Sequence, residues 1–298
     1  MRILLIGREG QVGWELQRSL SPIGEVCGLG RKALDLEDVN AICSCVRDYR
    51  PEVIVNAAAY TAVDKAESEP WKAHAINAEA AAVLAHVSAA VNAWLVHYST
   101  DYVFDGMKDT PYAETDGTNP LSVYGKTKCE GEMQIRRANP KHLIFRTSWV
   151  YAARGNNFPR TIIRLAKQKE TLQVVADQYG APTSAEFIAD VTALALHHLT
   201  GTGFSDGVAG TYHLTAGGST TWYEYAEYVL ALVRAQGISL RAEEVQPIST
   251  DAYPVAAIRP RNSRLDTTKV SRTFSLQFPH WKYHIERVVN SFAGEVMQ

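Results

Sequence analysis

The first thirteen residues, MRILLIGREGQVG (1–13), decide the fold class. An apolar run at Arg2–Ile6 leads directly into a turn with glycines at Gly7, Gly10 and Gly13. A strand, a glycine turn and a helix in this order form the context of a dinucleotide fingerprint, although the spacing here is GxxGxxG rather than GxGxxG. Gly7 would permit the tight turn, Gly10 the approach of a pyrophosphate and Gly13 the packing of helix on sheet. The stretch therefore predicts a dinucleotide site, with the phosphates at a helix N-terminus.

The rest of the first half alternates short apolar runs with longer helical patterns, which is typical of βαβ units around a parallel sheet. Strands are predicted at Arg2–Ile6, Glu25–Leu29, Glu52–Asn56, Trp94–Ser99 and His142–Ser148. Helices are predicted at Gln11–Ser19, Asp38–Tyr49, Pro70–Val91, Pro120–Arg137 and Phe158–Lys169. Asn119 is the predicted N-cap of the fourth helix, with Pro120 at its first position.

After about residue 150 the pattern is irregular. Strands are expected at Leu172–Ala176 and Thr211–Leu214, helices at Ala185–Leu199 and Trp222–Ala235, and loops at Pro247–Arg264. We predict an α/β fold, namely a Rossmann-type doubly wound parallel sheet with a smaller C-terminal substrate-binding lobe. Residues 1–150 would form an NAD(P)-binding domain, completed by parts of 185–220. Residues 151–298 would mainly form the lobe.

Composition narrows the functional class. The 298 residues are 46% hydrophobic and 21% charged, with a formal net charge of −2, and no Lys/Arg block stands out. These values fit a globular protein and argue against a nucleic-acid polymer as partner. The apolar N-terminal run is too short for a signal peptide or membrane span, so no membrane partner and a cytoplasmic location are expected. The four cysteines lack zinc-finger spacing and are expected to be reduced.

The ends of the second and third strands indicate how a dinucleotide would be held. The second strand ends in GLGRK (28–32), without the acid that would bond a ribose 2′-OH. Arg31 could instead pair with the 2′-phosphate of NADPH, the alternative being an ordinary exposed arginine. The third strand is followed by Ala57, Ala58 and Ala59, which are small enough for a cofactor to approach closely. Tight packing against a helix is the alternative for these alanines.

A Tyr-x-x-x-Lys pair, Tyr124 and Lys128, provides candidate carbonyl chemistry. On a helix these positions share a face. Reduction of a ketone needs a proton on oxygen, and an adjacent ammonium would lower the pKa of the tyrosine and make it a better acid–base group. Thr100 follows the fourth strand and could hydrogen-bond the substrate oxygen. Ser99 competes for this role because neighbours on a strand point to opposite sides.

Several further stretches support these motifs: VIVNAAAYTAVDKAE, VHYSTDYVFDG, NPLSVYGKTKCEGE, LIFRTSWVYA with GNNF, DQYGAPTSAE and RPRNSRLDT. Together with GREGQVG they cover nearly the whole chain. The set resembles the extended short-chain dehydrogenase/reductases and, within them, the dTDP-4-dehydrorhamnose reductase family.

The resemblance implies roles for particular residues. It gives the reaction to Thr100, Tyr124 and Lys128. It implies substrate contacts from Val63, Thr100, Asp101, Tyr102 and Trp149. It implies cofactor contacts from Gly10, Gln11, Val12, Asp35, Leu36, Ala59, Tyr60, Thr61, Tyr98 and Lys128, and Tyr124 lies beside them.

The implied activity is NADPH-dependent reduction of the C4 ketone of dTDP-4-dehydrorhamnose to dTDP-L-rhamnose, which supplies lipopolysaccharide or O-antigen synthesis; NADH stays open. Tyr124 would donate the proton. One alternative is a non-catalytic regulatory subunit similar to the β subunit of methionine adenosyltransferase, which the intact Thr100, Tyr124 and Lys128 disfavour. Another is an epimerase or dehydratase of the same fold. Tyr102 stands where a dehydratase of this type would carry a glutamate, which disfavours dehydration.

Some members of the family form homodimers around magnesium held by glutamates. Glu15 and Glu186 are similar to two of those ligands, and a solvated helix face is the alternative for both. The third glutamate is replaced near Ser291, with Glu286 and Glu295 off position. No metal is therefore predicted, while Mg²⁺ binding and a homodimer stay open.

Two tryptophans are interpreted differently. Trp149 stands at a strand end and is expected to stack on the ligand, whereas Trp222 is expected to be a core aromatic. The nine histidines show no metal-ligand cluster, and His280 and His284 are interpreted as a chance pair.

Overall fold

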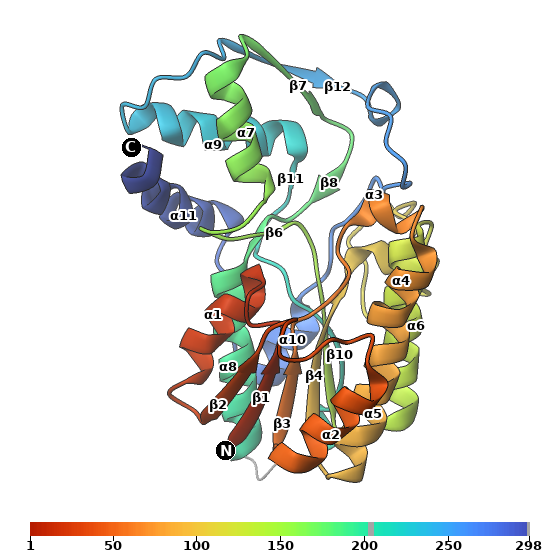
Figure 1. The fold of residues 1–298 in the computed structure, drawn as a ribbon. Coiled ribbons are helices and arrows are strands. Elements are labelled where there is room, and N and C mark those ends of the chain that lie inside the picture. Colours follow the sequence, from red (N-terminus) through yellow and green to blue (C-terminus); the bar gives the residue numbers. More distant parts are fainter. Residues whose placement is uncertain (202–205, 297–298) are drawn as a thin grey trace.

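A computed structural model describes residues 1–201 and 206–296 and has a six-stranded parallel sheet at its centre (Figure 1). The strand order is β10-β5-β4-β3-β1-β2. The strands are β1 (Arg2–Ile6), β2 (Glu25–Leu29), β3 (Val53–Asn56), β4 (Trp94–Thr100), β5 (His142–Thr147) and β10 (Gly210–His213). Every neighbouring pair is parallel. The predicted α/β fold of Rossmann type is confirmed.

Helices cover both faces of this sheet (Figure 1). One layer holds α1 (Gln11–Leu20), α8 (Ala185–Gly201) and α10 (Thr268–Phe274). The other holds α2 (Val39–Tyr49), α4 (Pro70–His74), α5 (Ala80–Ala90) and α6 (Val123–Ala138). Within the strands, residues alternate between the two cores: Leu5 packs in the first with Leu16 and Ile188, and Leu4 in the second with Ile42. Burial on both faces explains why these strands are almost wholly apolar.

A smaller lobe lies beyond the carboxyl ends of the strands (Figure 1). Its helices are α7 (Phe158–Gln168), α9 (Trp222–Ala235) and α11 (Trp281–Val296). Short paired strands complete it: β7 (Thr171–Val175) with β12 (Glu244–Ile248), β6 (Val150–Tyr151) with β9 (Thr183–Ser184), and β8 (Tyr179–Gly180) with β11 (Thr220–Thr221). Thr221 and Glu224 form a capping box that fixes where α9 begins. The lobe has its own core around Tyr151, Tyr225 and Trp281.

The fourth predicted helix starts later than the sequence indicated. We expected Asn119 as its cap, but α6 begins at Val123, where the Ser122 hydroxyl accepts the amide N–H of Gly125 at 3.1 Å. Asn119 instead donates to Asp105 Oδ2 at 3.0 Å and so belongs to the preceding loop. That prediction was wrong because the Asn119 side chain is hydrogen-bonded to Asp105 and Ser122 caps the helix instead.

Other differences are smaller. The helix predicted at Pro70–Val91 contains a π-helical turn, η1 (Ala75–Glu79), between α4 and α5. A short helix, α3 (Val63–Ala66), precedes it. Three short 3₁₀ helices, η2 (Asp101–Val103), η3 (Asp206–Val208) and η4 (Thr250–Ala252), also occur. Helices α10 and α11 and strand β12 have no counterpart among the elements expected from the sequence. No helix in the described part of the chain is long and apolar enough to cross a membrane.

A buried ion pair joins α6 to the sheet. Glu132 is 0% exposed and Arg146 of β5 is 3% exposed. Arg146 Nε lies 2.8 Å from Oε1 and Nη2 lies 2.7 Å from Oε2, which is a bidentate arrangement. Arg136 adds a contact to Oε2 at 3.0 Å. The pair fixes the helix that carries Tyr124 and Lys128 against the sheet.

Candidate active site

A cavity of about 860 Å³ is lined by residues at the carboxyl ends of β1, β3 and β4 and by Trp149, Val150, Asn156 and Trp222 from the side of the lobe. In open α/β sheets this edge is where ligands bind. Most sequence-predicted cofactor residues line it: Gly7, Gly10, Gln11, Val12, Arg31, Asp35, Leu36, Ala57, Ala58, Ala59, Tyr60, Thr61, Tyr98, Tyr124 and Lys128. So do the predicted substrate residues: Val63, Thr100, Asp101, Tyr102 and Trp149. The structure therefore brings together segments from β1 to α6 and from β6.

The glycine turn at the end of β1 has a shape that other residues would not adopt. Gly7 has φ +86°, and a Cβ there would lie 2.7 Å from the amide nitrogen of Ala58. Gly13 does not line the cavity, and its Cβ would lie 2.0 Å from the Gly7 carbonyl oxygen. Gly10 is the N-cap of α1 and has no side chain to occupy the helix N-terminus. This open, positive helix end fits a pyrophosphate.

Gly13→Ala tests the packing of α1 on this turn. The added methyl would meet the Gly7 carbonyl at 2.0 Å, so α1 has to move away from the turn. We expect a loss of about 1–3 kcal/mol in the free energy of unfolding, which is usual for overpacking, together with weaker NADPH binding. Urea denaturation and a fluorescence titration with NADPH measure both. Gly117→Ala is the control because a Cβ at Gly117 meets nothing within 4 Å; equal effects of the two variants would contradict the packing argument.

The end of the cavity next to β2 contains Arg31. Its Nη2 lies 3.2 Å from Glu37 Oε2, and its side chain is 64% exposed. A guanidinium has five N–H donors, so this contact leaves donors for a phosphate. Asn157, the N-cap of α7, donates to Gln11 Oε1 at 3.0 Å. The lobe thus touches the glycine turn directly. Its neighbour Asn156 also lines the cavity, although only the GNNF stretch hinted at a role.

Thr100, Asp101 and Tyr124 meet at the other end. The Thr100 hydroxyl donates to Asp101 Oδ1 at 2.9 Å and accepts the amide N–H of Tyr102 at 3.2 Å. Burial raises the pKa of Asp101 to about 6, opposed by hydrogen bonds from Ser263 and Thr100. Ser99, the competitor for Thr100, also lines the cavity. The structure thus gives Thr100 the contact with Asp101, whereas the Ser99 hydroxyl is buried near Glu132.

Tyr124 differs from our expectation. We expected the Lys128 ammonium to lower its pKa, but burial raises the pKa of Tyr124 to about 12, and the opposing hydrogen bond comes from Thr100. Tyr124 therefore holds its proton at neutral pH, which suits a proton donor. The reason is that the lysine amine is directed to other partners.

Lys128 is buried and contacts β4. Its Nζ donates to the carbonyl oxygen of Tyr98 at 2.6 Å and lies 3.0 Å from His97 Nε2. Burial lowers the pKa of Lys128 to about 8. His97 Nδ1 in turn lies 3.2 Å from Asn56 Nδ2. His97 and Asn56 were not predicted as site residues, although strand alternation places His97 on the face of β4 opposite Tyr98.

Trp149 and Trp222 form a stacked pair, with ring centroids 3.6 Å apart and planes 12° from parallel. Trp149 has φ +48°, an unfavourable backbone conformation for a bulky residue. Both rings line the cavity. Interpreting Trp222 as a core aromatic was therefore incomplete, because it is half-buried and contributes to the cavity wall. Strain held in place by packing is common at functional sites.

The two glutamates suggested as magnesium ligands have arginine partners. Glu15 Oε2 lies 3.3 Å from Arg18 Nε, and Glu186 Oε1 lies 3.2 Å from Arg287 Nη2. Within residues 1–201 and 206–296, no group of three His, Cys, Asp or Glu could hold a metal ion. Each of the two glutamates is therefore engaged by an arginine within the described part of this chain. Ser291 and Glu295 lie in α11, but their side chains are outside the described part of the chain.

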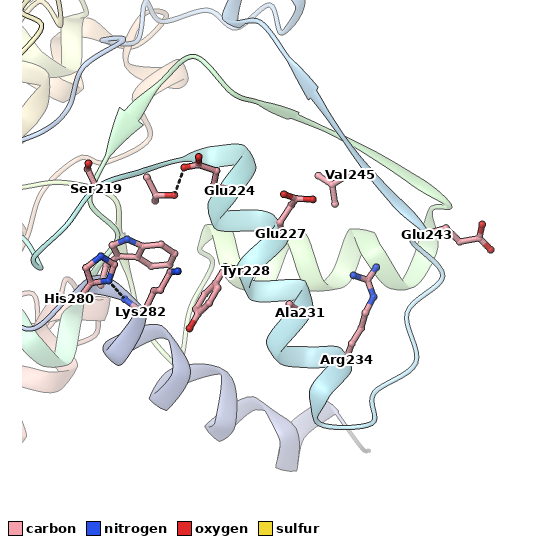
Figure 2. Close-up of a pocket in the computed structure, with 12 residues that line it drawn as sticks. Ser219, Glu224, Glu227, Tyr228, Ala231, Arg234, Glu243, Val245, His280 and Lys282 are labelled. Carbon is pink, nitrogen blue, oxygen red and sulfur yellow. Dashed lines mark hydrogen bonds between the residues drawn. The ribbon is translucent and has the colours of Figure 1, made fainter.

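A second hollow of about 670 Å³ lies away from these residues, on the lobe between α9, β12 and the start of α11. Figure 2 shows Glu227, Tyr228 and Arg234 along α9, with Glu243 on one side and Lys282 on the other. Glu224 here accepts the hydroxyl of Thr220 at 3.0 Å as well as capping α9. None of the site residues predicted from the sequence lies in this hollow.

Comparison with known proteins identifies the family. The family described as RmlD substrate binding domain matches residues 1–293. The chain belongs to this family. Its RmlD-type relatives include a dTDP-4-dehydrorhamnose reductase of Salmonella typhimurium, 52% identical over 293 residues that cover 97% of each chain.

Solved structures of two proteins named dTDP-4-dehydrorhamnose reductase agree with the fold. A dTDP-4-dehydrorhamnose reductase of Clostridium acetobutylicum is 36% identical with a TM-score of 0.90, covering 97% of this chain and 99% of that one. The Bacillus anthracis dTDP-4-dehydrorhamnose reductase in complex with NADP is also 36% identical, with a TM-score of 0.86 and coverage of 96% and 97%.

Proposed function

We propose that this chain is an NADPH-dependent oxidoreductase that reduces the C4 ketone of dTDP-4-dehydrorhamnose to dTDP-L-rhamnose. The observation that carries the proposal is the convergence of Thr100, Tyr124 and Lys128 in the same cavity as the glycine turn. A dinucleotide site alone would fit many functions, whereas this trio adds acid–base chemistry for a carbonyl. The names of the RmlD-type relatives and the NADP in the Bacillus anthracis protein support the substrate and the cofactor.

Different residues of this chain would donate the proton, orient the ketone oxygen and contact the sugar nucleotide. Bound NADPH supplies the hydride. Tyr124 keeps its proton at neutral pH and donates it to the oxygen that gains negative charge as the ketone is reduced. The Thr100 hydroxyl orients that oxygen, and such preplaced donors stabilise the developing charge. Asp101, Tyr102, Val63 and Trp149 then contact the dTDP-sugar.

The cofactor would lie along the glycine turn. The N-terminus of α1 at Gly10, Gln11 and Val12 would hold the pyrophosphate, and Ala57–Tyr60, Thr61, Tyr98 and Lys128 would contact the rest of the cofactor. Asp35 and Leu36 flank the adenosine. In this proposal residues 1–150 with parts of 185–220 bind the cofactor and 151–298 mainly bind the sugar nucleotide. The enzyme acts in the cytoplasm, and a homodimer is compatible with it.

Arg31→Ala tests the preference for NADPH. Loss of one charge-assisted hydrogen bond to the 2′-phosphate is expected to raise KM for NADPH by about tenfold and to leave KM for NADH unchanged. Initial rates with each cofactor measure the effect. Lys32→Ala is the matched control, because Lys32 is an adjacent exposed cation outside the cavity. Equal changes for both cofactors would place Arg31 away from the 2′-phosphate.

The decisive assay offers the purified protein dTDP-4-dehydrorhamnose with NADPH or NADH, each with and without EDTA. We expect NADPH oxidation with formation of dTDP-L-rhamnose. We expect EDTA to have no effect, because the described glutamates do not form a metal site. Absence of oxidation with either cofactor would overturn the proposal.

A further inference from the structure

A chain of buried polar contacts runs from the backbone of Ala58 to the amine of Lys128. The amide N–H of Ala58 meets Asn56 Oδ1 at 3.1 Å. A backbone N–H can only donate, so this contact fixes which end of the Asn56 amide carries the oxygen. The NH₂ group, Nδ2, then faces His97 Nδ1 at 3.2 Å, and it too can only donate. The direction of each hydrogen bond is therefore set at Ala58.

This direction determines the tautomer of His97. Because Nδ1 accepts a hydrogen bond, the proton of the neutral imidazole lies on Nε2. Burial and the nearby Lys128 amine lower the pKa of His97 well below its usual range, so the neutral ring is the relevant form. Nε2–H then points at Lys128 Nζ, 3.0 Å away. A hydrogen bond there needs a lone pair on Nζ, which the neutral amine has and the ammonium lacks.

The groups around Lys128 Nζ do not reverse this preference for the neutral amine. The titratable or charged groups nearby are His97 and Tyr98 of β4, Tyr124 and Glu132 of α6, and Arg146 of β5. Glu132 favours the ammonium through its charge, but both of its oxygens are bound by Arg146. Lys128 itself is 1% exposed and Tyr98 offers it a carbonyl oxygen.

We propose that Asn56 and His97 are positioning residues that bias Lys128 toward its neutral amine through the fixed direction of this hydrogen-bonded chain. This effect adds to that of burial, which by itself already lowers the pKa of Lys128. Lys128 Nζ contacts Tyr98 and His97, so in the proposed reaction a bound ligand would have to bridge it to the Tyr124 hydroxyl before its proton could replace the one that Tyr124 gives up. That last role rests on the proposed reductase activity, whereas the tautomer and the protonation state do not.

The test measures protonation directly by NMR on the full-length protein. In ¹⁵N-histidine protein at pH 9, His97 is expected in the Nε2–H tautomer. In protein carrying ¹³Cε-lysine, with Lys128→Met for assignment, the Lys128 amine is expected to titrate well below the ordinary value of about 10.4. The Nδ1–H tautomer in the unaltered protein at pH 9 would overturn the inference.

Two substitutions at Asn56 distinguish the effect of hydrogen-bond direction from the effect of an added negative charge. Asn56→Asp accepts both the Ala58 N–H and a proton from His97 Nδ1, so it reverses the chain. We expect the Nδ1–H form of His97 and a rise in the pKa of Lys128 by about one unit, a tenfold gain in proton affinity. Asn56→Ala removes the donor without adding charge and is expected to raise that pKa in the same direction. A rise in Asn56→Asp that is absent from Asn56→Ala would overturn the directional argument.

Asn139→Asp is the matched control, because it places the same carboxylate at another buried asparagine. Asn139 is 1% exposed and donates to Ser88 Oγ at 2.7 Å and to the Ala93 carbonyl oxygen at 3.1 Å. It is expected to leave the His97 tautomer and the Lys128 pKa unchanged. In the enzyme assay, the pH profile of kcat should move upward in Asn56→Asp and stay in place in the control. An inactive protein with the predicted NMR results would reject the reductase and retain the inference.

Discussion

Tyr124→Phe is expected to lower kcat for dTDP-4-dehydrorhamnose reduction by about 10²–10⁴-fold, the usual contribution of a general acid. The hydroxyl removed is the group that holds its proton at neutral pH, because burial raises its pKa to about 12. The phenyl ring retains the shape of the side chain, so the affinity for NADPH should stay close to that of the unaltered protein. Steady-state rates and a fluorescence titration with NADPH measure the two quantities separately.

Tyr225→Phe is the matched control for this experiment. Tyr225 is also buried, but it lies in the core of the lobe, and its hydroxyl has no hydrogen-bond partner within the described residues. Removing that hydroxyl should leave kcat unchanged. Near-normal turnover in Tyr124→Phe would remove Tyr124 from the mechanism, and an equal loss in both variants would point to a general effect on packing.

Glu132→Leu is expected to lower the free energy of unfolding by about 3–5 kcal/mol, because it leaves the Arg146 guanidinium buried without its carboxylate. The pKa of Glu132 is lowered by its hydrogen bonds and charge contacts with Arg146, which outweigh burial. A depressed pKa means that the stability from this pair is present above the unfolded-state value of about 4.3 and is lost as pH falls through the folded-state value. Urea denaturation at pH 7 measures the loss.

An exposed ion pair provides the comparison. Glu170 and Arg241 are 2.6 Å apart but largely exposed, so Glu170→Ala should leave the urea midpoint nearly unchanged. Adding Arg146→Met to Glu132→Leu removes the unpaired charge and should recover much of the lost stability. If the double variant were less stable than Glu132→Leu by the full cost of a second independent deletion, the buried-charge explanation would fail.

The sheet was predictable because its signal is local. Arg2–Ile6 is a short apolar run ended by glycine, and the observed β1 has the same bounds. The start of α6 was not predictable from its proline, because Asn119 is engaged by Asp105, which precedes it by fourteen positions. Local patterns identify elements, while the competition between partners that decides their ends is set by the three-dimensional structure.

The candidate site likewise contains residues that local sequence patterns predict and contacts that only the three-dimensional structure reveals. Strand ends and small residues identified part of the lining of the cavity, since parallel strands bring their carboxyl ends to one edge, while the contacts of residues such as Asp35, Val63 and Trp149 were implied only by the family resemblance. The contact between Lys128 and His97 was missed because it depends on which face of α6 meets which face of β4. Trp222 was misjudged for a similar reason: its stacking on Trp149 joins residues far apart in the chain.

The edge strand β10 has a consequence for how the protein is made. It pairs with β5 only after the chain has passed through α7 and α8, so Gly210–His213 reaches the sheet late in synthesis. Until then the growing chain on the ribosome carries an open β5 edge, the kind of surface on which chains aggregate. A fragment that stopped at residue 150 would keep that open edge permanently. The sheet and the lobe are therefore not expected to be exchangeable between relatives as separate segments, because part of the lobe lies in the chain between β5 and β10.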